Sequence, residues 1–388
     1  MAYDSGGEFR LKMNEEEREF YWYWFVNIRG IGNVTRNKLL SLFGHPKHIY
    51  HGEEKEVSKV LGPKQMMSFR KSRNKKNIIE SMQRLEQNRI RFIHWESDEY
   101  PDALRHIYDP PYGLYLIGRM PEKNKPVLGM VGARNATIYG RKTAERFAKI
   151  LAENGIQIIS GLAAGIDAAS HRGALQAGRY TMGILGGGID TIYPRENFNL
   201  YMEMYERGGV LSEYNMGVEN YSGLFPARNR LISGMSDGIM VVEAGESSGS
   251  LITVDQALEQ GKDVFSLPGR ITDPMSVGCN RLIAQGAYLV QTPEEILHIL
   301  KEKGNKGSLI SEQRVNGKEF HGSIEPEFHS PEQKNIYGLL DEVIPKNFDM
   351  LLQESGYNIR TLQHILFEME LLGWIYQPNQ NTYLKIFL

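Results

Sequence analysis

The sequence predicts an α/β fold built on a doubly wound, mostly parallel sheet. Apolar strands alternate with helical segments between residues 90 and 290, the pattern typical of such a sheet. Four of these strands end in glycine-rich turns. After residue 304 the composition becomes polar, so the sheet is not expected to continue there. We therefore expect an extended Rossmann-like domain with a smaller domain on either side.

At 388 residues the chain is too long for one typical domain. Hydrophobic residues at 41% and charged residues at 24% are ordinary for a soluble globular protein. No apolar run approaches the roughly 18 residues of a membrane span, and the polar N-terminus lacks a signal-peptide pattern. A cytoplasmic protein without membrane contact is expected. The expected domains are a helical N-terminal domain (1–105), a Rossmann-like domain (106–304), a linker (305–330) and a winged helix (331–388).

The first hundred residues have helical periodicity, with helix stops expected at Gly30, Gly44 and Gly62. Residues 28–40 (IRGIGNVTRNKLL) place a G-x-G hairpin before a helix. This resembles the helix-hairpin-helix and SAM type of small helical domain, in which hairpin amides can bind a nucleic-acid phosphate. A helical turn that needs two glycines explains the pattern equally well. The basic run 64–76 is either a solvated face or part of an electrostatic path.

The Rossmann-like region is expected to contain nine strands and several helices, including 137–154, 165–177 and 249–260. The expected strands are 90–95, 113–118, 126–131, 156–160, 180–185, 209–213, 238–243, 263–267 and 287–290.

The glycine-rich turns are the most informative feature of this region. They occur in VLGMVGAR (127–134), IQIISGLAAGID (156–167), TMGILGGGID (181–190) and GIMVVEAGESSGSLIT (238–253). In an open parallel sheet such turns meet at one edge, where ligands bind. Glycine lets backbone amides approach a phosphate, and the following helix directs its positive end toward it. The turns therefore predict a phosphate-binding surface.

Arginines and one aromatic residue are expected at the same edge. An arginine within a glycine turn can fork onto a phosphate, and several together suit a polyanion. Phe198 is either a platform for an unpaired base or a core aromatic of its helix. The candidate arginines are Arg134, Arg195, Arg228 and Arg230.

Several familiar chemistries are absent from the sequence. The segment nearest to a P-loop, GALQAGRY (173–180), lacks the required Lys and Ser/Thr. The glycine turn after the strand 126–131 does not read G-x-G-x-x-G. The next strand, 156–160, ends at Ser160 rather than at an acidic residue that could bind a ribose, so a dehydrogenase is disfavoured. Neither H-E-x-x-H nor G-x-S-x-G occurs. No catalytic residue and no cofactor is expected.

Three further residues are of types that can carry chemistry. The single Cys279 excludes an intramolecular disulfide and a clustered-cysteine zinc site, and no metal is expected. Asp167 and His171 are four residues apart on one helix face, as a general acid–base pair would be. We favour a structural role, with Asp167 capping or complementing the helix N-terminus and His171 packed against the sheet or facing solvent.

The C-terminal region 331–388 is expected to form three short helices and two strands, 374–377 and 383–387, as in a winged helix-turn-helix. It contains seven acidic and four basic residues, a net charge of −3. The presumptive recognition helix, 358–372, has only Arg360 as a base, whereas a groove-reading helix needs a basic footprint. A protein-contact or structural role is the expectation.

Eight motifs in order resemble the DNA-processing protein A (DprA/Smf) family. They cover residues 110–300 densely, and the resemblance extends more loosely to both ends of the chain. The motifs are VGARNATIYG, SGLAAGIDAASH, LGGGIDTIYPREN, LSEY, FPARNRLISG, EAGESSGSLIT, VFSLPG and GCNRLIAQGA.

The resemblance implies a bacterial cytosolic protein that binds single-stranded DNA and helps load the recombinase RecA onto it in natural transformation. It implies no enzymatic activity. Family members also dimerise, here near residues 278–287, and Leu282 and Ile283 are the residues suggested for that dimer or RecA surface. The DNA-binding residues carried over by motif are Gly132, Arg134, Ser160, Gly161, Arg195, Phe198, Arg228, Asn229, Arg230 and Ser250.

The chain departs from the family at Ala164, where many members carry a basic residue. The rival interpretation is a nucleotide-processing enzyme similar to phosphoribohydrolases with a P-G-G-x-G-T-x-x-E turn. Aligning 245–253 with that pattern places Thr253 where the catalytic Glu would stand and Ser250 at the Thr position. A nucleotide sensor that uses the same loops is a third possibility.

Overall fold

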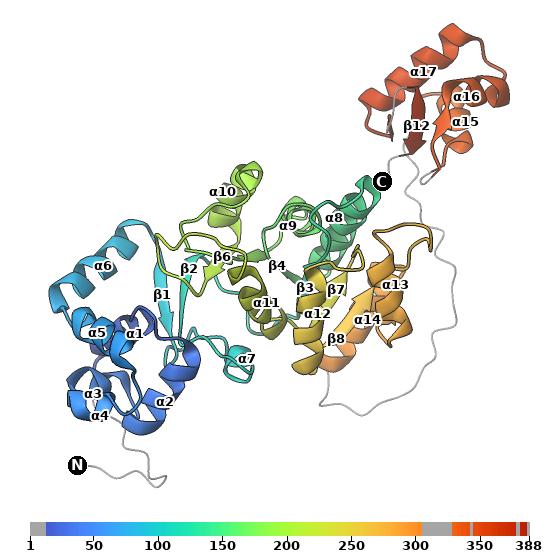
Figure 1. Ribbon diagram of the computed structural model, residues 1–388. Helices are drawn as coiled ribbons and strands as arrows, with labels where there is room; N and C mark the ends of the chain where they lie inside the picture. The colour runs from blue at the N-terminus through green and yellow to red at the C-terminus, as the bar shows by residue number, and fades with distance from the viewer. Residues whose placement is uncertain (1–12, 305–327, 342–343, 378–380, 386–388) are drawn as a thin grey trace. The chain divides into compact units, whose positions relative to one another are not determined.

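The computed structural model describes residues 13–304, 328–341, 344–377 and 381–385 (Figure 1). The chain divides into two compact units, Met1–Gly307 and Ser308–Leu388. The helical N-terminal part and the Rossmann-like part share the first unit. The predicted boundary at residue 105 stays a prediction, and most of the predicted linker lies outside the described residues. Among the residues that the structure describes, none of the helices combines the length and the apolar composition that a membrane span requires.

The first unit contains a nine-stranded sheet with the order β1-β2-β6-β5-β4-β3-β7-β8-β9. The strands from β6 to β9 in this order are parallel, whereas β2 pairs antiparallel with β6 and with β1. All nine predicted strands are confirmed. They are β1 (Arg91–His94), β2 (Gly113–Gly118), β3 (Val127–Val131), β4 (Gln157–Ser160), β5 (Thr181–Ile184), β6 (Gly209–Ser212), β7 (Gly238–Val241), β8 (Asp263–Ser266) and β9 (Tyr288–Leu289).

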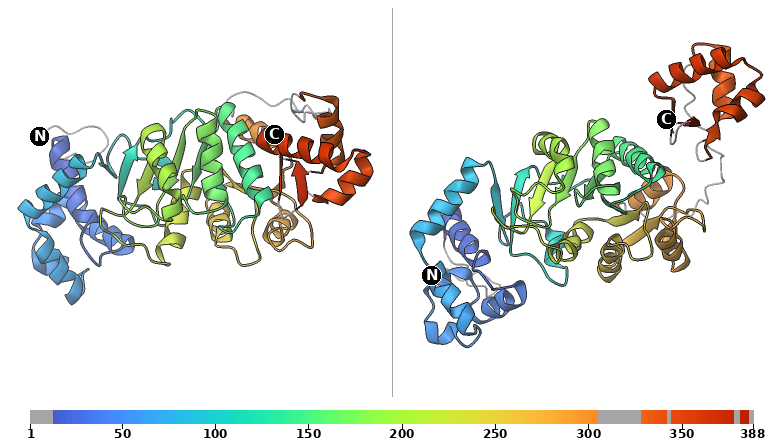
Figure 2. Two further views of the ribbon diagram at one scale, coloured as in Figure 1. Left: turned by 90° about the horizontal axis from the view of Figure 1, so that it is seen from above. Right: turned by 45° about the horizontal axis from the view of Figure 1, so that its top comes forward.

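Helices cover both faces of this sheet (Figure 2). Because side chains alternate along a strand, Leu128 and Met130 of β3 pack on one face with α8, α9 and α14, whereas Val127 and Val131 pack on the other with α11, α12 and α13. The predicted helices match within one residue. The helices are α8 (Ile138–Glu153), α9 (Ile166–Gln176), α10 (Phe198–Arg207), α11 (Leu224–Gly234), α12 (Ser250–Glu259), α13 (Val277–Ala284) and α14 (Pro293–Gly304), with a 3-10 turn at Arg195–Asn197.

The N-terminal helices pack onto the β1–β2–β6 end of the sheet. Trp24 and Phe25 share one core with Tyr115 of β2 and Tyr201 of α10. The Asn27 side-chain amide also donates to the Tyr115 hydroxyl at 2.7 Å. These helices are α1 (Glu15–Val26), α2 (Asn33–Phe43), α3 (Pro46–His51), α4 (Glu54–Val57), α5 (Pro63–Ser72) and α6 (Lys75–Gln87), and α7 (Asp102–Arg105) lies between β1 and β2.

One of the three predicted helix stops is confirmed, because Gly44 ends α2 at φ +76°. Helix α1 already ends at Val26 with Asn27 as its C-cap, so Gly30 lies in the following turn and does not end the helix. Gly62 instead precedes α5 as its N-cap, so the prediction that it ends a helix is wrong. Pro63 explains the difference, because proline at the first helical position favours a helix start.

The second unit has the three predicted helices, α15 (Pro331–Leu339), α16 (Phe348–Ser355) and α17 (Ile359–Leu371). Its antiparallel sheet has the order β10-β12-β11, with β10 (Lys346–Asn347), β11 (Ile375–Tyr376) and β12 (Thr382–Lys385). β10 was not predicted. The α17 side chains Phe367 and Leu371 are 60% and 72% exposed, so apolar residues occupy the outer face of the presumptive recognition helix. The winged-helix assignment stays a prediction.

Candidate functional site

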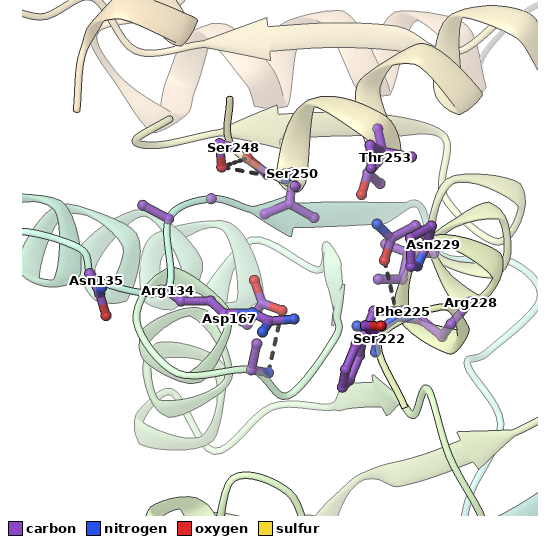
Figure 3. Close-up of a pocket in the computed structure, with 18 of the residues that line it drawn as sticks. Arg134, Asn135, Asp167, Ser222, Phe225, Arg228, Asn229, Ser248, Ser250 and Thr253 are labelled. Atoms are coloured by element: carbon purple, nitrogen blue, oxygen red, sulfur yellow. Dashed lines mark hydrogen bonds between the residues drawn. The ribbon is translucent and has the colours of Figure 1, made fainter. Parts of the chain in front are cut away.

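A pocket of about 810 Å³ lies beyond the carboxyl ends of the central strands (Figure 3). We call it the main pocket. The strand order reverses at β3, whose neighbours β4 and β7 lead to opposite ends of the sheet, and ligands of doubly wound folds bind at such a point. The turn after β3, the start of α11 and the turn before α12 line the pocket. Five of the predicted site residues lie there, namely Gly132, Arg134, Arg228, Asn229 and Ser250.

Arg134 is the exposed cation of the main pocket. It forms no ion pair with any carboxylate in the described part of the chain. Its guanidinium lies 4.8 Å from the centroid of the Phe225 ring, and Phe225 in turn packs against Tyr193 at 5.9 Å between centroids. Arg134 is therefore held beside an aromatic pair with its hydrogen-bond donors free for a ligand.

Arg228 forms part of the pocket wall and is only 5% exposed. Its Nη1 donates to the Gly161 carbonyl at 2.8 Å and to the Ile184 carbonyl. Burial lowers the pKa of this guanidinium to about 10. Arg228 therefore joins the turn after β4 to the end of β5, and its ligand-binding capacity is reduced by these carbonyl contacts.

Asp167 completes this arrangement. Its carboxylate accepts hydrogen bonds from the amides of Gly161 at 3.1 Å and Ala163 at 3.4 Å. Burial raises the pKa of Asp167, while the nearby Arg228 opposes the shift. Asp167 is the one carboxylate among the described residues that line the main pocket. It holds the shape of the glycine turn.

His171 does not reach the main pocket. It is fully buried, and its Nδ1 lies 2.7 Å from the Thr181 hydroxyl. Burial lowers the pKa of His171 to about 3, so the ring is neutral at physiological pH. The structural interpretation of His171 is confirmed, and that of Asp167 is refined because its carboxylate binds the preceding loop.

The other predicted DNA-binding residues lie around the pocket rather than in its lining. The Ser160 hydroxyl donates to the Met130 carbonyl, and Gly161 accepts from Arg228. Arg195 and Phe198 are exposed, Phe198 at 51%, in the segment that follows β5. Phe198 is thus not the core aromatic that was the alternative.

Arg230 differs from its prediction. Its guanidinium donates to Glu213 at 2.7 Å and to Asp109 at 3.2 Å, and the residue is 8% exposed. Side chains two residues apart on a helix point to different sides, so Arg228 and Arg230 cannot both face the pocket. The expectation that the Arg230 guanidinium is offered to a ligand is wrong.

The suggested partner surface also needs correction. Leu282 is 7% exposed and packs in the core of its own unit with Val254 and Val264. The prediction that Leu282 lies on a dimer or RecA surface is wrong, because helix α13 turns this residue inward. Ile283, its neighbour, is partly exposed.

The structure adds residues that sequence reasoning missed. A second hollow of about 520 Å³ shares Arg134 and Asn135 with the main pocket and is also lined by Arg141 and Arg172. Exposed aromatic side chains follow several of the same strand ends, and only Phe198 among them was predicted. They are Tyr139 at 47%, Tyr193 at 49%, Phe198 at 51% and Tyr221 at 62% exposed.

Residues 91–301 match the family model described as DNA recombination-mediator protein A. The chain belongs to this family. It is 37% identical over 310 residues to Protein Smf of Escherichia coli (strain K12), covering 78% of this chain and 79% of that protein. It is 43% identical over 215 residues to the DNA processing protein DprA of Bacillus subtilis (strain 168), covering 55% and 72%. The family resemblance of the motifs is thereby confirmed.

Solved structures agree with this assignment. The X-ray structure of DprA from Streptococcus pneumoniae superposes with a TM-score of 0.64 at 32% identity, covering 75% of this chain and 99% of that one. The structure of DprA from Helicobacter pylori, described as showing a single-stranded DNA binding mode, superposes with a TM-score of 0.51 at 30% identity. The match covers 55% of this chain and 96% of that one.

Proposed function

We propose that this protein binds single-stranded DNA at the main pocket, without catalysis, and delivers the strand to RecA. The observation that carries the proposal is the combination at one sheet edge of exposed aromatic residues with arginines that form no ion pair among the residues the structure describes. Single-strand binding surfaces combine a basic groove with stacking aromatics in this way. The single-stranded DNA bound by the Helicobacter pylori relative supports the same ligand class.

In the proposed complex, Arg134 forks onto a phosphate, and the amides of the turns after β3 and before α12 hold the neighbouring one. Tyr193, Tyr221 or Phe198 stacks a base. Stacking and phosphate contacts carry no base code, so affinity is sequence-tolerant. A flexible strand can enter a pocket at a sheet edge, whereas a stiff duplex cannot.

RecA delivery, homodimer formation and a cytoplasmic location belong to the same proposal and rest on family membership. A dimer would present two pockets to one long strand and so raise its avidity. RecA delivery is tested by the rate at which RecA filaments form on a strand coated with single-strand-binding protein, with and without this protein. An unchanged rate would contradict the delivery step alone.

A non-catalytic role fits the residues of the pocket. Hydrolysis of a nucleotide needs a carboxylate poised for acid–base work, and Thr253 stands at the position where the related hydrolases carry it. Asp167 is engaged by two amides and by Arg228. A nucleotide sensor stays the second candidate, because a pocket of about 810 Å³ also suits a small ligand.

The first test is a fluorescence-anisotropy titration of a labelled single-stranded oligonucleotide. Unlabelled duplex and a nucleoside monophosphate serve as competitors. Tight binding that weakens with salt, and that both competitors displace poorly, is expected. Weak oligonucleotide binding with strong competition by the mononucleotide would refute the proposal and favour the sensor.

The Arg134→Ala variant tests the site itself. It should weaken binding to all sequences and lower the salt slope by roughly 0.7 to 1, the share of one phosphate contact. Arg179→Ala is the matched control, because Arg179 is also exposed but precedes β5 and so lies at the opposite edge of the sheet. An unchanged affinity and slope in folded Arg134→Ala would exclude Arg134 from the site.

A further inference from the structure

The second hollow lies directly beside the main pocket, and Arg134 and Asn135 belong to both. Its sides come from the start of α8, with Arg141, and from α9, with Arg172. Ala164 is part of its lining, the position where many family members carry a basic residue. The two hollows therefore form one continuous surface that turns around Arg134.

The hollow has a net positive charge. Arg134, Arg141 and Arg172 form no ion pair in the described part of the chain, and all three are exposed. Elsewhere on the same unit exposed arginines such as Arg91 and Arg207 are paired with glutamates. Among the described residues that line the hollow, Glu196 is the single carboxylate, so three cations face one anion and their net charge is +2.

The hollow is also shaped for a close approach by a phosphodiester. Small residues at the start of α9, Ala164, Gly165 and Ala168, keep bulky side chains away from it. The Arg141 Nη1 donates to the Ala136 carbonyl at 2.6 Å, which orients the guanidinium and leaves its other donors free. Arg141 is therefore preorganised to bind an oxygen anion.

We propose that the second hollow holds further phosphates of the strand whose first nucleotide occupies the main pocket, with Arg141 and Arg172 as the binding residues. The inference rests on the proposed function and names its ligand as a polynucleotide of at least two consecutive nucleotides. Arg141 and Arg172 restore the charge that Ala164 does not supply. A mononucleotide occupies the main pocket alone and does not depend on these arginines.

The test compares two ligands on the same variants. Arg141→Ala and Arg172→Ala should each lower the oligonucleotide salt slope by about 0.7, which corresponds to a roughly fivefold loss of affinity at 0.1 M salt. The double variant should lose about 25-fold on the same arithmetic. Mononucleotide affinity should stay unchanged. Lys149→Ala on α8 is the matched control, because Lys149 is an exposed cation outside the lining of the hollow.

A gain of affinity gives an independent check. Glu196→Gln removes the one negative charge of the hollow and should strengthen oligonucleotide binding by about two- to threefold, again without effect on the mononucleotide. A substitution that merely disturbed folding would not improve binding. Unchanged or weaker binding by Glu196→Gln counts against the inference.

The outcomes separate this inference from the proposed function. If the unmodified protein does not bind the oligonucleotide, the proposed function fails. If it binds, and Arg134→Ala weakens binding while the Arg141 and Arg172 variants keep the wild-type salt slope, the function stands and the inference is refuted. Equal weakening for oligonucleotide and mononucleotide also refutes it, because the hollow would then belong to a one-nucleotide site.

Discussion

Substitution of Arg228 tests whether this residue stabilises the fold of the site rather than binding the ligand. In Arg228→Ala the carbonyls of Gly161 and Ile184 lose a buried donor, and Asp167 loses the positive charge beside it. An unsatisfied buried acceptor costs about 1–3 kcal/mol, and breaking a buried charge arrangement costs about 3–5 kcal/mol. We expect the variant to lose about 3–5 kcal/mol of stability, on the scale of the second figure.

For a unit of about 300 residues, with an unfolding entropy of about 2.1 cal/mol/K per residue, that loss corresponds to a fall of about 5–8 °C in melting temperature. Circular dichroism during heating, with Arg134→Ala as the control, measures it. The control should lose less than about 1 kcal/mol, since the exposed Arg134 contributes a cation–π contact with Phe225. Equal melting temperatures for the two variants would refute the conclusion that Arg228 stabilises the pocket wall whereas Arg134 is free to bind the ligand.

The loss should also depend on pH. Burial already raises the pKa of Asp167, and removal of Arg228 raises it further. A carboxyl whose pKa is higher in the native state than in the unfolded chain contributes less stability as the pH rises. Arg228→Ala should therefore be less destabilised at pH 5 than at pH 8. A larger loss at pH 5 would contradict the coupling between these two residues.

Three other predictions concern buried groups. Arg230→Ala should destabilise the protein by about 3–5 kcal/mol, because it leaves Glu213 unpaired. Its oligonucleotide affinity in anisotropy titrations should stay unchanged, and a selective loss of affinity would contradict the placement of Arg230 outside the pocket. Burial raises the pKa of the Cys279 thiol to about 11, so alkylation of the native protein at pH 8 should be slow until denaturant is added. Fast alkylation without denaturant would contradict the burial of Cys279. Because the pKa of His171 is lowered to about 3, the protein should lose stability as the pH falls below 6.5. In denaturant titrations His171→Gln should lose less stability over this pH range, and an equally steep loss would exclude His171 as the cause.

The sheet was predictable from the sequence because its signals are local. Apolar strands of four to six residues separated by helical segments identify all nine strands, and the glycine turns locate the ligand edge. β10 was missed because two residues, Lys346 and Asn347, carry no periodicity. The antiparallel addition of β1 and β2 was also not readable, since strand direction depends on pairing with the distant β6.

The site was predictable in its location and less so in its individual residues. The sequence identifies Arg228 and Arg230 as cations near the carboxyl edge of the sheet. It does not show that the Arg230 guanidinium is bound by the carboxylates of Glu213 and of Asp109, which is 121 residues away in the sequence. Arg141 and Arg172 were missed because an exposed arginine on a helix is usually solvated, and only the fold brings them to one hollow.

The packing of the N-terminal helices onto the sheet allows intrinsic tryptophan fluorescence to report the unfolding of this unit. Trp22 and Trp24 share a core with Leu200, Tyr201 and Met204 of α10. None of the described residues that line the main pocket or the second hollow is a tryptophan, so ligands there should not quench these indoles directly. Their emission should nevertheless shift at a higher temperature when a ligand stabilises the unit, because the tryptophans and both hollows belong to one compact unit. Intrinsic fluorescence during heating can thus rank ligands for an unlabelled protein.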